Sequence, residues 1–168
     1  MQNEYKRIVD KYNGILYKIA RSYTSEEADF KDLYQEILIQ LWKSFDNFQG
    51  KAKLSTWIYR VALNTALTFQ RNRKRQPKSE QFESVNISLV DHSVADIARV
   101  KERESQIELL YQCIYQLKKD QRAIILLYLD GRKYDEIAEI TGLKANHIGV
   151  KISRIKQQLQ KIMAEKNS

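Results

Sequence analysis

The residues of this chain that could perform covalent chemistry are few and scattered. Cys113 is the single cysteine, and His92 and His147 are the only histidines. One thiol cannot form an intrachain disulfide, and these three side chains cannot assemble an ordinary zinc cluster. No glycine-rich phosphate loop and no nucleophile paired with a base stands out either. We therefore expect a protein that is not an enzyme and needs no cofactor, with Cys113 a buried thiol on a helix.

The polar side chains with a clear pattern are suited to binding. Asp32, Gln35 and Glu36 lie away from the apolar stripe of one predicted helix. They offer an acidic, amide-rich face to a protein partner. Cations dominate the end of the following helix, where an aromatic and an amide accompany them. The candidates for contact with nucleic acid in this stretch are Lys51, Lys53, Trp57, Arg60, Asn64, Arg71, Arg73, Lys74 and Arg75.

Charge is distributed in blocks. The chain of 168 residues has a net charge of +8, which favours an anionic partner, either nucleic acid or a membrane surface. The net charge is +6 over residues 1–76, −2 over residues 77–104 and +4 over residues 105–168. With five glycines and one proline, long helices meet few breakers. We expect an all-α protein with two basic domains and an acidic linker between them.

The first domain, residues 1–76, is expected to be a bundle of about four helices. Gly50 permits a tight turn in the loop DNFQGKAK, and Ser55 is a plausible cap for the helix after it. The periodicity of that helix places Tyr59 on the outer side with Arg60 and Asn64. The residues predicted to face inward on the two central helices are Leu33, Ile37, Leu38, Leu41, Trp42, Phe45, Ile58, Val61, Ala62, Thr65 and Phe69.

The linker is expected over residues 77–104. Pro77 ends the preceding helix, and clear periodicity is lost until about Glu102. Fully extended, this stretch could span on the order of 90 Å, which would let two domains occupy separate sites on DNA.

The second domain, residues 105–168, carries the pattern of a helix-turn-helix. Leu129 belongs to a run too apolar for the surface, Ala138 allows close helix crossing, and Gly142 can adopt the left-handed turn. Ile148, Ile152, Ile155 and Leu159 form an inner stripe, so the opposite face would enter a DNA major groove. A solvated basic helix is the plainer alternative. The candidate DNA-binding residues here are Lys144, Asn146, His147, Lys151, Arg154 and Lys156.

Two motifs in residues 32–75 resemble region 2 of bacterial sigma factors, specifically the small extracytoplasmic-function (ECF) class of the sigma-70 family. DLYQE resembles the motif that binds core RNA polymerase, and FQGKAKLSTWIYRVALNTAL resembles the motif that melts and reads the promoter minus-ten element. The resemblance implies that Asp32, Gln35 and Glu36 bind polymerase. It also implies that the Gly50 loop pockets an unstacked base and that Asn64 contacts a base.

The C-terminal pattern resembles sigma region 4, which reads the minus-thirty-five element. Many members carry Gly-Thr-Val-Arg-Ser-Arg where this chain has Asn146 to Lys151, so Gly149 and Val150 replace side chains that often contact DNA. Trp57 has two open interpretations, a wedge at the duplex edge or simple core packing. The resemblance also implies an anti-sigma partner and transcription initiation as the function.

Two other functions remain open at this point. The helix-turn-helix alone would serve a stand-alone transcriptional regulator, and the helical surfaces could instead belong to an adaptor that binds only proteins. The N-terminus lacks an apolar signal core, and no apolar run reaches membrane-spanning length. We therefore expect a cytoplasmic location and no membrane insertion.

Overall fold

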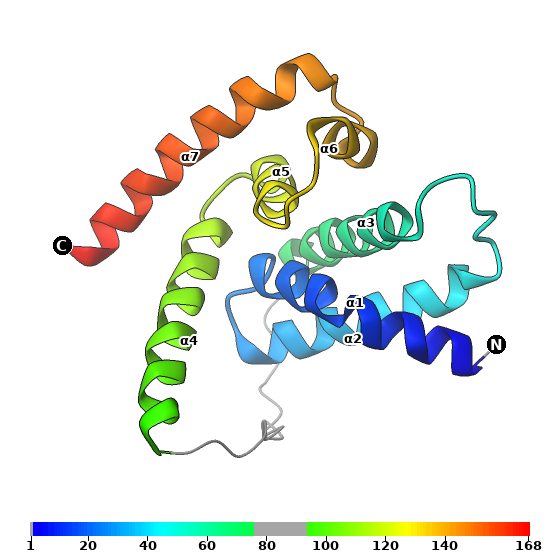
Figure 1. Cartoon of the computed structure of the whole chain (residues 1–168), viewed down its shortest axis with the longest axis horizontal. Coiled ribbons are helices and arrows are strands. Elements are labelled where there is room, and N and C mark those ends of the chain that lie inside the picture. The colour runs from blue at the N-terminus through cyan, green and yellow to red at the C-terminus, as the bar shows by residue number, and fades with distance from the viewer. Residues whose placement is uncertain (1, 76–93) are drawn as a thin grey trace.

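The computed structural model describes residues 2–75 and 94–168, with side chains placed from 2 to 75 and from 102 onward. Every regular element in these two ranges is an α-helix, which confirms the all-α prediction (Figure 1). The helices are α1 (Gln2–Ser22), α2 (Glu27–Phe45), α3 (Leu54–Arg75), α4 (Val94–Tyr115), α5 (Lys119–Leu129), α6 (Tyr134–Thr141) and α7 (Ala145–Asn167).

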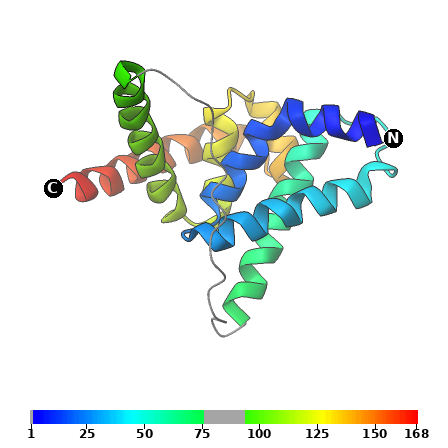
Figure 2. The same ribbon diagram turned by 90° about the horizontal axis from the view of Figure 1, so that it is seen from below.

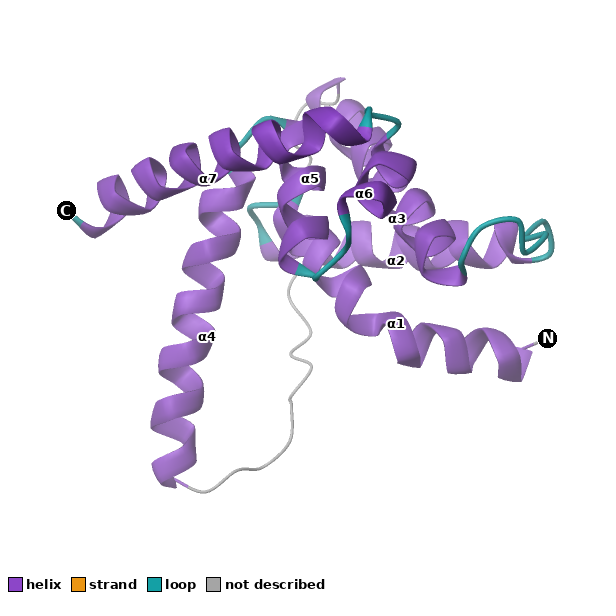
Figure 3. Ribbon diagram, turned by 45° about the horizontal axis from the view of Figure 1, so that its top comes forward, coloured by secondary structure: helices purple, strands orange, loops and turns teal. Residues whose placement is uncertain are grey.

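The N-terminal domain consists of α1, α2 and α3, three helices where about four were expected. Each contributes a stripe of apolar residues at three-and-four spacing, represented by Leu16, Leu33 and Ile58, all fully or almost fully buried. Gly50, at φ +68°, makes the predicted turn between α2 and α3. This loop projects from the end of the domain that lies away from α4 (Figure 3).

The C-terminal domain contains the predicted helix-turn-helix, formed by α6 and α7. Gly142 adopts φ +76° and donates its backbone N–H to the carbonyl of Ala138, 2.9 Å away, which ends α6. The inner stripe of α7 is confirmed, since Ile148, Ile152, Ile155 and Leu159 are buried. The turn and the stripe together hold the opposite side of α7 toward solvent.

Helix α4 begins at Val94, eight residues before periodicity was expected to return. The end of the predicted linker is therefore helical. The rest of it, with Pro77 and His92, lies outside the described residues.

The two domains pack against each other, and their buried residues form one continuous cluster. Helix α3 lies against α6, and α1 contacts α4 and α5 (Figures 1 and 2). Tyr23, 2% exposed, lies under α5, where its hydroxyl donates to the carbonyl of Lys119 at 2.9 Å. The guanidinium of Arg122 lies 5.2 Å from the Tyr23 ring. These contacts join segments roughly a hundred residues apart in sequence.

This packing explains where the predicted burial was wrong. Tyr59, expected on the outer side of α3, is only 2% exposed because the C-terminal domain covers it. Trp42 and Leu129, expected inside, are 39% and 52% exposed. Helical periodicity identifies the apolar side of a helix, but the neighbours available to cover that side depend on tertiary structure.

Candidate polymerase and nucleic-acid interfaces

The predicted polymerase-binding residues lie together on the outer side of α2. Asp32 and Gln35 are exposed, while Glu36 is half-buried and accepts a 2.8 Å hydrogen bond from the amide of Gln40. The buried residues Leu33 and Ile37 hold the opposite side of the helix in the core. The structure therefore brings the three predicted side chains onto one accessible surface.

Arg73 of α3 is bound to this acidic surface. Its Nη2 forms an ion pair with the carboxylate of Asp29 and lies 3.5 Å from Oδ2 of Asp32. Asp29 was missed at the sequence level, although its position three residues before Asp32 places both carboxylates on one side of α2. Arg73, predicted to grip phosphate, thus joins α2 to α3 in this structure.

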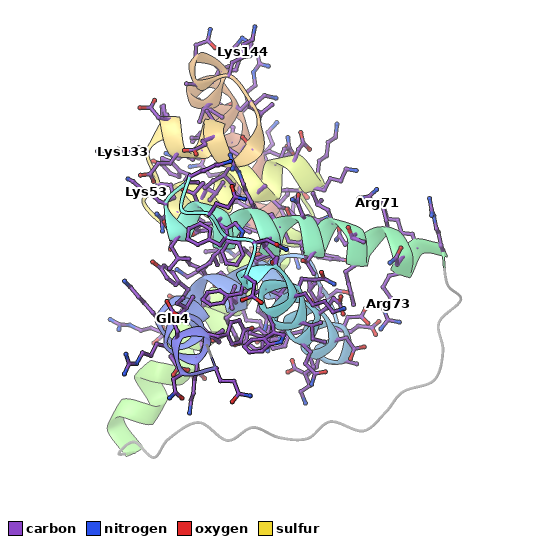
Figure 4. All side chains as sticks on the ribbon, turned by 90° about the vertical axis from the view of Figure 1, so that its right-hand side faces the viewer. Glu4, Lys53, Arg71, Arg73, Lys133 and Lys144 are labelled. Atoms are coloured by element: carbon purple, nitrogen blue, oxygen red, sulfur yellow. The ribbon has the colours of Figure 1, made fainter. Side chains whose placement is uncertain are left out.

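The other cations at the end of α3 are free to face solvent. Arg71, Lys74 and Arg75 are exposed, and so is Asn64 about two to three turns before them. Arg71 and Arg73 leave α3 on different sides (Figure 4). This end of α3 projects beyond the rest of the molecule, so a nucleic-acid backbone could approach it (Figure 2).

An open hollow of about 200 Å³ lies where the Gly50 loop meets α3. This is far more than the roughly 10–15 Å³ that a single water needs. Its amide, aromatic and cationic lining could stack and hydrogen-bond a planar heterocycle. Asn47, Phe48 and Gln49 were missed as site residues at the sequence level. The full lining is Asn47, Phe48, Gln49, Lys51, Ala52, Trp57 and Arg60.

Trp57 is packed against aromatic neighbours and also borders the hollow. The ring is half-buried, with its centroid 6.4 Å from that of Phe45 and 5.1 Å from that of Phe48. It also lines both the hollow and a small apolar cavity of about 10 Å³ between α1, α2 and α3. The indole therefore packs into the core while part of its surface lines the hollow.

Lys53 and Arg60 are held by helix α6 of the other domain. Nζ of Lys53 donates to Oε1 of Glu136 at 3.3 Å, and Nη2 of Arg60 donates to the backbone carbonyl of Glu139 at 2.7 Å. In Figure 4, Lys53 lies at the start of α3 beside the C-terminal domain, with Lys133 nearby. Two of the cations predicted to bind the minus-ten strand are thus in intramolecular contacts.

The six candidate residues around the start of α7 lie on its solvent side. Lys144, Asn146, His147, Arg154 and Lys156 are exposed, and Lys151 is half-buried. Among the described residues, no carboxylate lies within ion-pair distance of the cations of α7. Nζ of Lys156 does donate to the hydroxyl of Tyr128 at 2.6 Å, which ties it to α5.

Gly149 lies at a close approach between α6 and α7. A Cβ atom at this position would lie 3.3 Å from Cε2 of Tyr134, so the glycine lets α6 and α7 approach closely. Val150 beside it is 55% exposed and places an apolar side chain on the side of α7 that is predicted to face DNA. Contact with a thymine methyl group is the base readout open to such a side chain.

Burial shifts the pKa values of Tyr59 and Cys113. Burial and the hydrogen bond to Asp130 raise the pKa of Tyr59 far above its ordinary value, so its hydroxyl remains a donor. Burial raises the pKa of the Cys113 thiol, and Lys166 acts in the opposite direction. The prediction of a buried cysteine is confirmed. Neither group belongs to a catalytic arrangement.

The described residues contain no group of His, Cys, Asp and Glu side chains that could hold a metal ion. Within the same part of the chain, no helix is long and apolar enough to cross a membrane.

Comparison with protein families accounts for both domains. The model of sigma-70 region 2 matches residues 8–76, and the model of sigma-70 region 4 matches residues 107–159. The chain belongs to the ECF class of the sigma-70 family. As a sigma factor it binds core RNA polymerase and directs promoter-specific transcription initiation, and it is not an enzyme. The match to region 2 removes the alternative of a stand-alone helix-turn-helix regulator.

Relatives of this sigma factor match along most of their length. ECF RNA polymerase sigma factor SigW of Bacillus subtilis is 29% identical over 95% of this chain and 89% of the relative. ECF RNA polymerase sigma-E factor of Escherichia coli is 25% identical over 94% of this chain and 85% of the relative. The family assignment made from the two sequence motifs is therefore confirmed.

Two solved structures share the fold. Sigma factor RpoE of Bartonella quintana, solved in complex with the anti-sigma factor NepR, has a TM-score of 0.68 at 22% identity and covers 96% of this chain and 97% of that chain. CnrH, solved with the cytosolic domain of CnrY, has a TM-score of 0.66 at 19% identity. The match covers 98% of this chain and 90% of that chain.

Proposed function

We propose that this sigma factor uses three surfaces, one for polymerase and two for promoter DNA. The outer side of α2 docks on core polymerase, the Gly50 loop and α3 capture the minus-ten strand, and α7 enters the major groove of the minus-thirty-five element. One observation carries this proposal. A single three-helix domain carries both the acidic surface of α2 and an aromatic, amide-lined hollow at the start of α3.

Docking on polymerase would use Asp32, Gln35 and Glu36. Two carboxylates and an amide on one helix suit a basic partner surface, because opposite charges steer the encounter and set the register of the complex. The bond from Gln40 to Glu36 holds that carboxylate in place before docking. The partner surface is therefore expected to present cationic side chains along a helix.

Strand capture would offset the cost of opening DNA. Each base step costs about 1.4 kcal/mol of stacking. A base that stacks on an aromatic side chain recovers roughly 1 to 3 kcal/mol. Trp57 and Phe48 supply two such surfaces at the hollow, and Asn64 offers an amide donor and acceptor on the exposed side of α3. Arg60, Arg71, Lys74 and Arg75 would bind phosphates, which positions the strand without reading its sequence.

Duplex recognition would use the solvent side of α7. Lys144, Lys151, Arg154 and Lys156 supply donors to phosphate and base edges, and Asn146 and His147 lie at the start of the helix that enters the groove. The side chains of Gly149 and Val150 cannot form hydrogen bonds with base edges, so α7 can read fewer bases through hydrogen bonds. We therefore expect a target hexamer that differs from those of relatives with Arg and Ser at these positions.

The relatives suggest how this sigma factor is regulated and where it acts. Because one structural neighbour was solved with an anti-sigma factor and the other with the cytosolic domain of CnrY, we expect an anti-sigma protein to bind this chain as well. Such a protein would cover one or both basic surfaces. We also expect the sigma factor to act in the cytoplasm, where polymerase and promoter DNA are found.

Run-off transcription on a randomised promoter library tests the proposal as a whole. Core polymerase with this chain should enrich one pair of hexamers, and core polymerase without it should enrich none. Failure to initiate on any template would contradict the proposal.

A charge reversal tests the docking surface by itself. Glu36→Lys should abolish binding to core polymerase and leave helical content unchanged. Glu4→Lys is the matched control, since it makes the same charge change at an exposed position of α1 (Figure 4). Equal binding by both variants would show that the docking surface lies elsewhere.

A further inference from the structure

We propose that Val150 reads the 5-methyl group of a thymine in the central base pairs of the minus-thirty-five element. Asn146 lies one helical turn before it and Arg154 one turn after it, so an amide and a guanidinium flank the apolar contact. The inference rests on the proposed function, because it names a base contact for the surface of α7 that was assigned there to duplex DNA.

Val150 lies at the centre of the solvent side of α7. With about 3.6 residues per turn, its side chain is directed almost opposite to those of Ile148 and Ile152, which are buried in the domain. Asn146 and Arg154, four residues before and after it, share its side of the helix, and both are exposed. A duplex that approaches this side therefore meets an amide, an apolar side chain and a guanidinium in one row.

Packing within the protein does not account for Val150. Its exposed fraction, 55%, is the largest among the exposed large apolar residues of the described chain. The helix has no acid from 145 to 160, so the surface around this side chain is polar or cationic. Such a surface suits an anionic partner that offers an apolar group among polar ones. Duplex DNA has this combination, since the thymine methyl lies in the major groove between two phosphate backbones.

Gly149 leaves room for the base edges beside Val150. It carries no side chain, and a Cβ atom at this position would lie 3.3 Å from Cε2 of Tyr134 in α6. On this side of Val150, no long side chain of α7 stands between the valine and the floor of the groove. The apolar contact can therefore be made at close range, which it requires because dispersion forces act only over short distances.

The spacing of the row matches that of base pairs. Residues four apart in a helix are separated by about 6 Å along its axis, and successive bases of one strand by about 3.4 Å. The row from Asn146 to Arg154 therefore covers about four base pairs. Asparagine pairs with adenine, arginine with guanine or phosphate, and an apolar side chain contacts the thymine methyl. We expect the thymine between the other two contacts.

Uracil substitution tests the inference with the wild-type protein, because uracil pairs as thymine does but lacks the 5-methyl group. The holoenzyme of core polymerase and the full chain first selects its minus-thirty-five element from the randomised promoter library. Each thymine of that element, on either strand, is then replaced by uracil in turn. One replacement should weaken binding of the holoenzyme to the promoter duplex about fourfold, as expected for one methyl group removed from an apolar contact. The other replacements should change binding much less.

A substitution of Val150 identifies the side chain responsible. Val150→Ser should bind the thymine and uracil duplexes equally well, because it lacks the methyl groups that contact the base. Thermal unfolding checks that the variant is folded. Val150→Gln, a better helix former without a branched apolar side chain, takes its place if it is not.

Ile107→Ser is the matched control. Ile107 is 50% exposed on α4, so the change again replaces an exposed apolar side chain with a hydroxyl. Helix α4 meets α7 far from Val150, where Nζ of Lys166 donates to Oε1 of Gln112 at 3.3 Å. This variant should keep the fourfold preference for thymine.

Three results would overturn the inference. If the selected element has no central thymine, or if no uracil replacement weakens binding, the methyl group is not read. A preference for thymine that persists in Val150→Ser would assign the contact to another residue. Loss of core polymerase binding by Val150→Ser, with no effect of uracil on the wild type, would make Val150 a protein contact. Failure of the proposed function is distinct, because the library would then yield no selected element at all.

Discussion

Helices α3 and α7 both carry basic surfaces, yet their cations are in different situations. Lys53, just before α3, and Arg60 and Arg73 on α3 contact acidic or carbonyl groups of α2 and α6. On α7, the cations of the first three turns have no carboxylate within ion-pair distance among the described residues, and the helix contains no acid from 145 to 160. Net charge alone does not reveal this difference, since both domains are basic.

The difference shows that the cations of a basic surface are not always free to bind phosphate. Cations that already have partners must exchange them for phosphate, so their net contribution to DNA binding is small. Cations with only water and counterions around them release those counterions and gain the full polyelectrolyte effect. We therefore expect α7 to dominate binding of duplex DNA by the free protein.

The largest effect should come from removing a core side chain on which α7 packs. Ile152 is 2% exposed, and Ile152→Ala should cost about 2 to 5 kcal/mol because it leaves a cavity under the helix. Duplex binding should be lost. Thermal unfolding and hydrogen exchange in α1 to α3 would show whether the N-terminal domain survives. Loss of protection there as well would mean that the two basic surfaces share one folding unit and cannot be compared independently.

A smaller effect is expected at the hollow on α3. Trp57→Ala should weaken open-complex formation roughly 5- to 150-fold, because 1 to 3 kcal/mol of base stacking is lost. Binding to core polymerase should be retained. Permanganate footprinting of the minus-ten region measures the opening, and Trp57→Phe is the control that keeps an aromatic ring. If Trp57→Ala still opens promoters, or if it unfolds, the indole serves packing alone.

Salt dependence compares the two surfaces directly. Lys151→Ala should make the slope of log K against log salt shallower by about 0.9 in duplex binding, since one phosphate contact is lost. Lys53→Ala should change the slope much less, because Glu136 already holds that ammonium group. Fluorescence anisotropy across a salt series gives both slopes. Equal changes would remove the distinction between occupied and available cations.

The smallest expected effect is a difference in stability between variants of two neighbouring arginines of α3. Arg73→Gln removes the ion pairs to Asp29 and Asp32 and should lower stability by up to about 1 kcal/mol, which is a few degrees in Tm. Arg71→Gln, at an exposed position, should leave Tm unchanged. Differential scanning calorimetry measures both variants. A larger loss with Arg71→Gln would place the important pair elsewhere on α3.

Much of the fold and part of the candidate site could be predicted before the structure was considered. The stripe of Ile148, Ile152, Ile155 and Leu159, the left-handed turn at Gly142 and the acidic side of α2 all follow from local periodicity and backbone preference. The lining of the hollow by Asn47 and Gln49 could not be predicted in this way. These residues lie in an irregular loop, where no period assigns a side chain to a surface.

The sequence by itself determined the helices, the apolar side of most of them and, through two motifs in order, the family. Tertiary structure alone decided that Tyr59 is buried, that Arg73 pairs with α2 and that Glu136 and Glu139 hold Lys53 and Arg60. The physical reason is the distance along the sequence over which each effect acts. Helical propensity and periodicity act over a few residues, whereas these contacts join residues from about 40 to 80 positions apart, whose meeting depends on how whole helices pack.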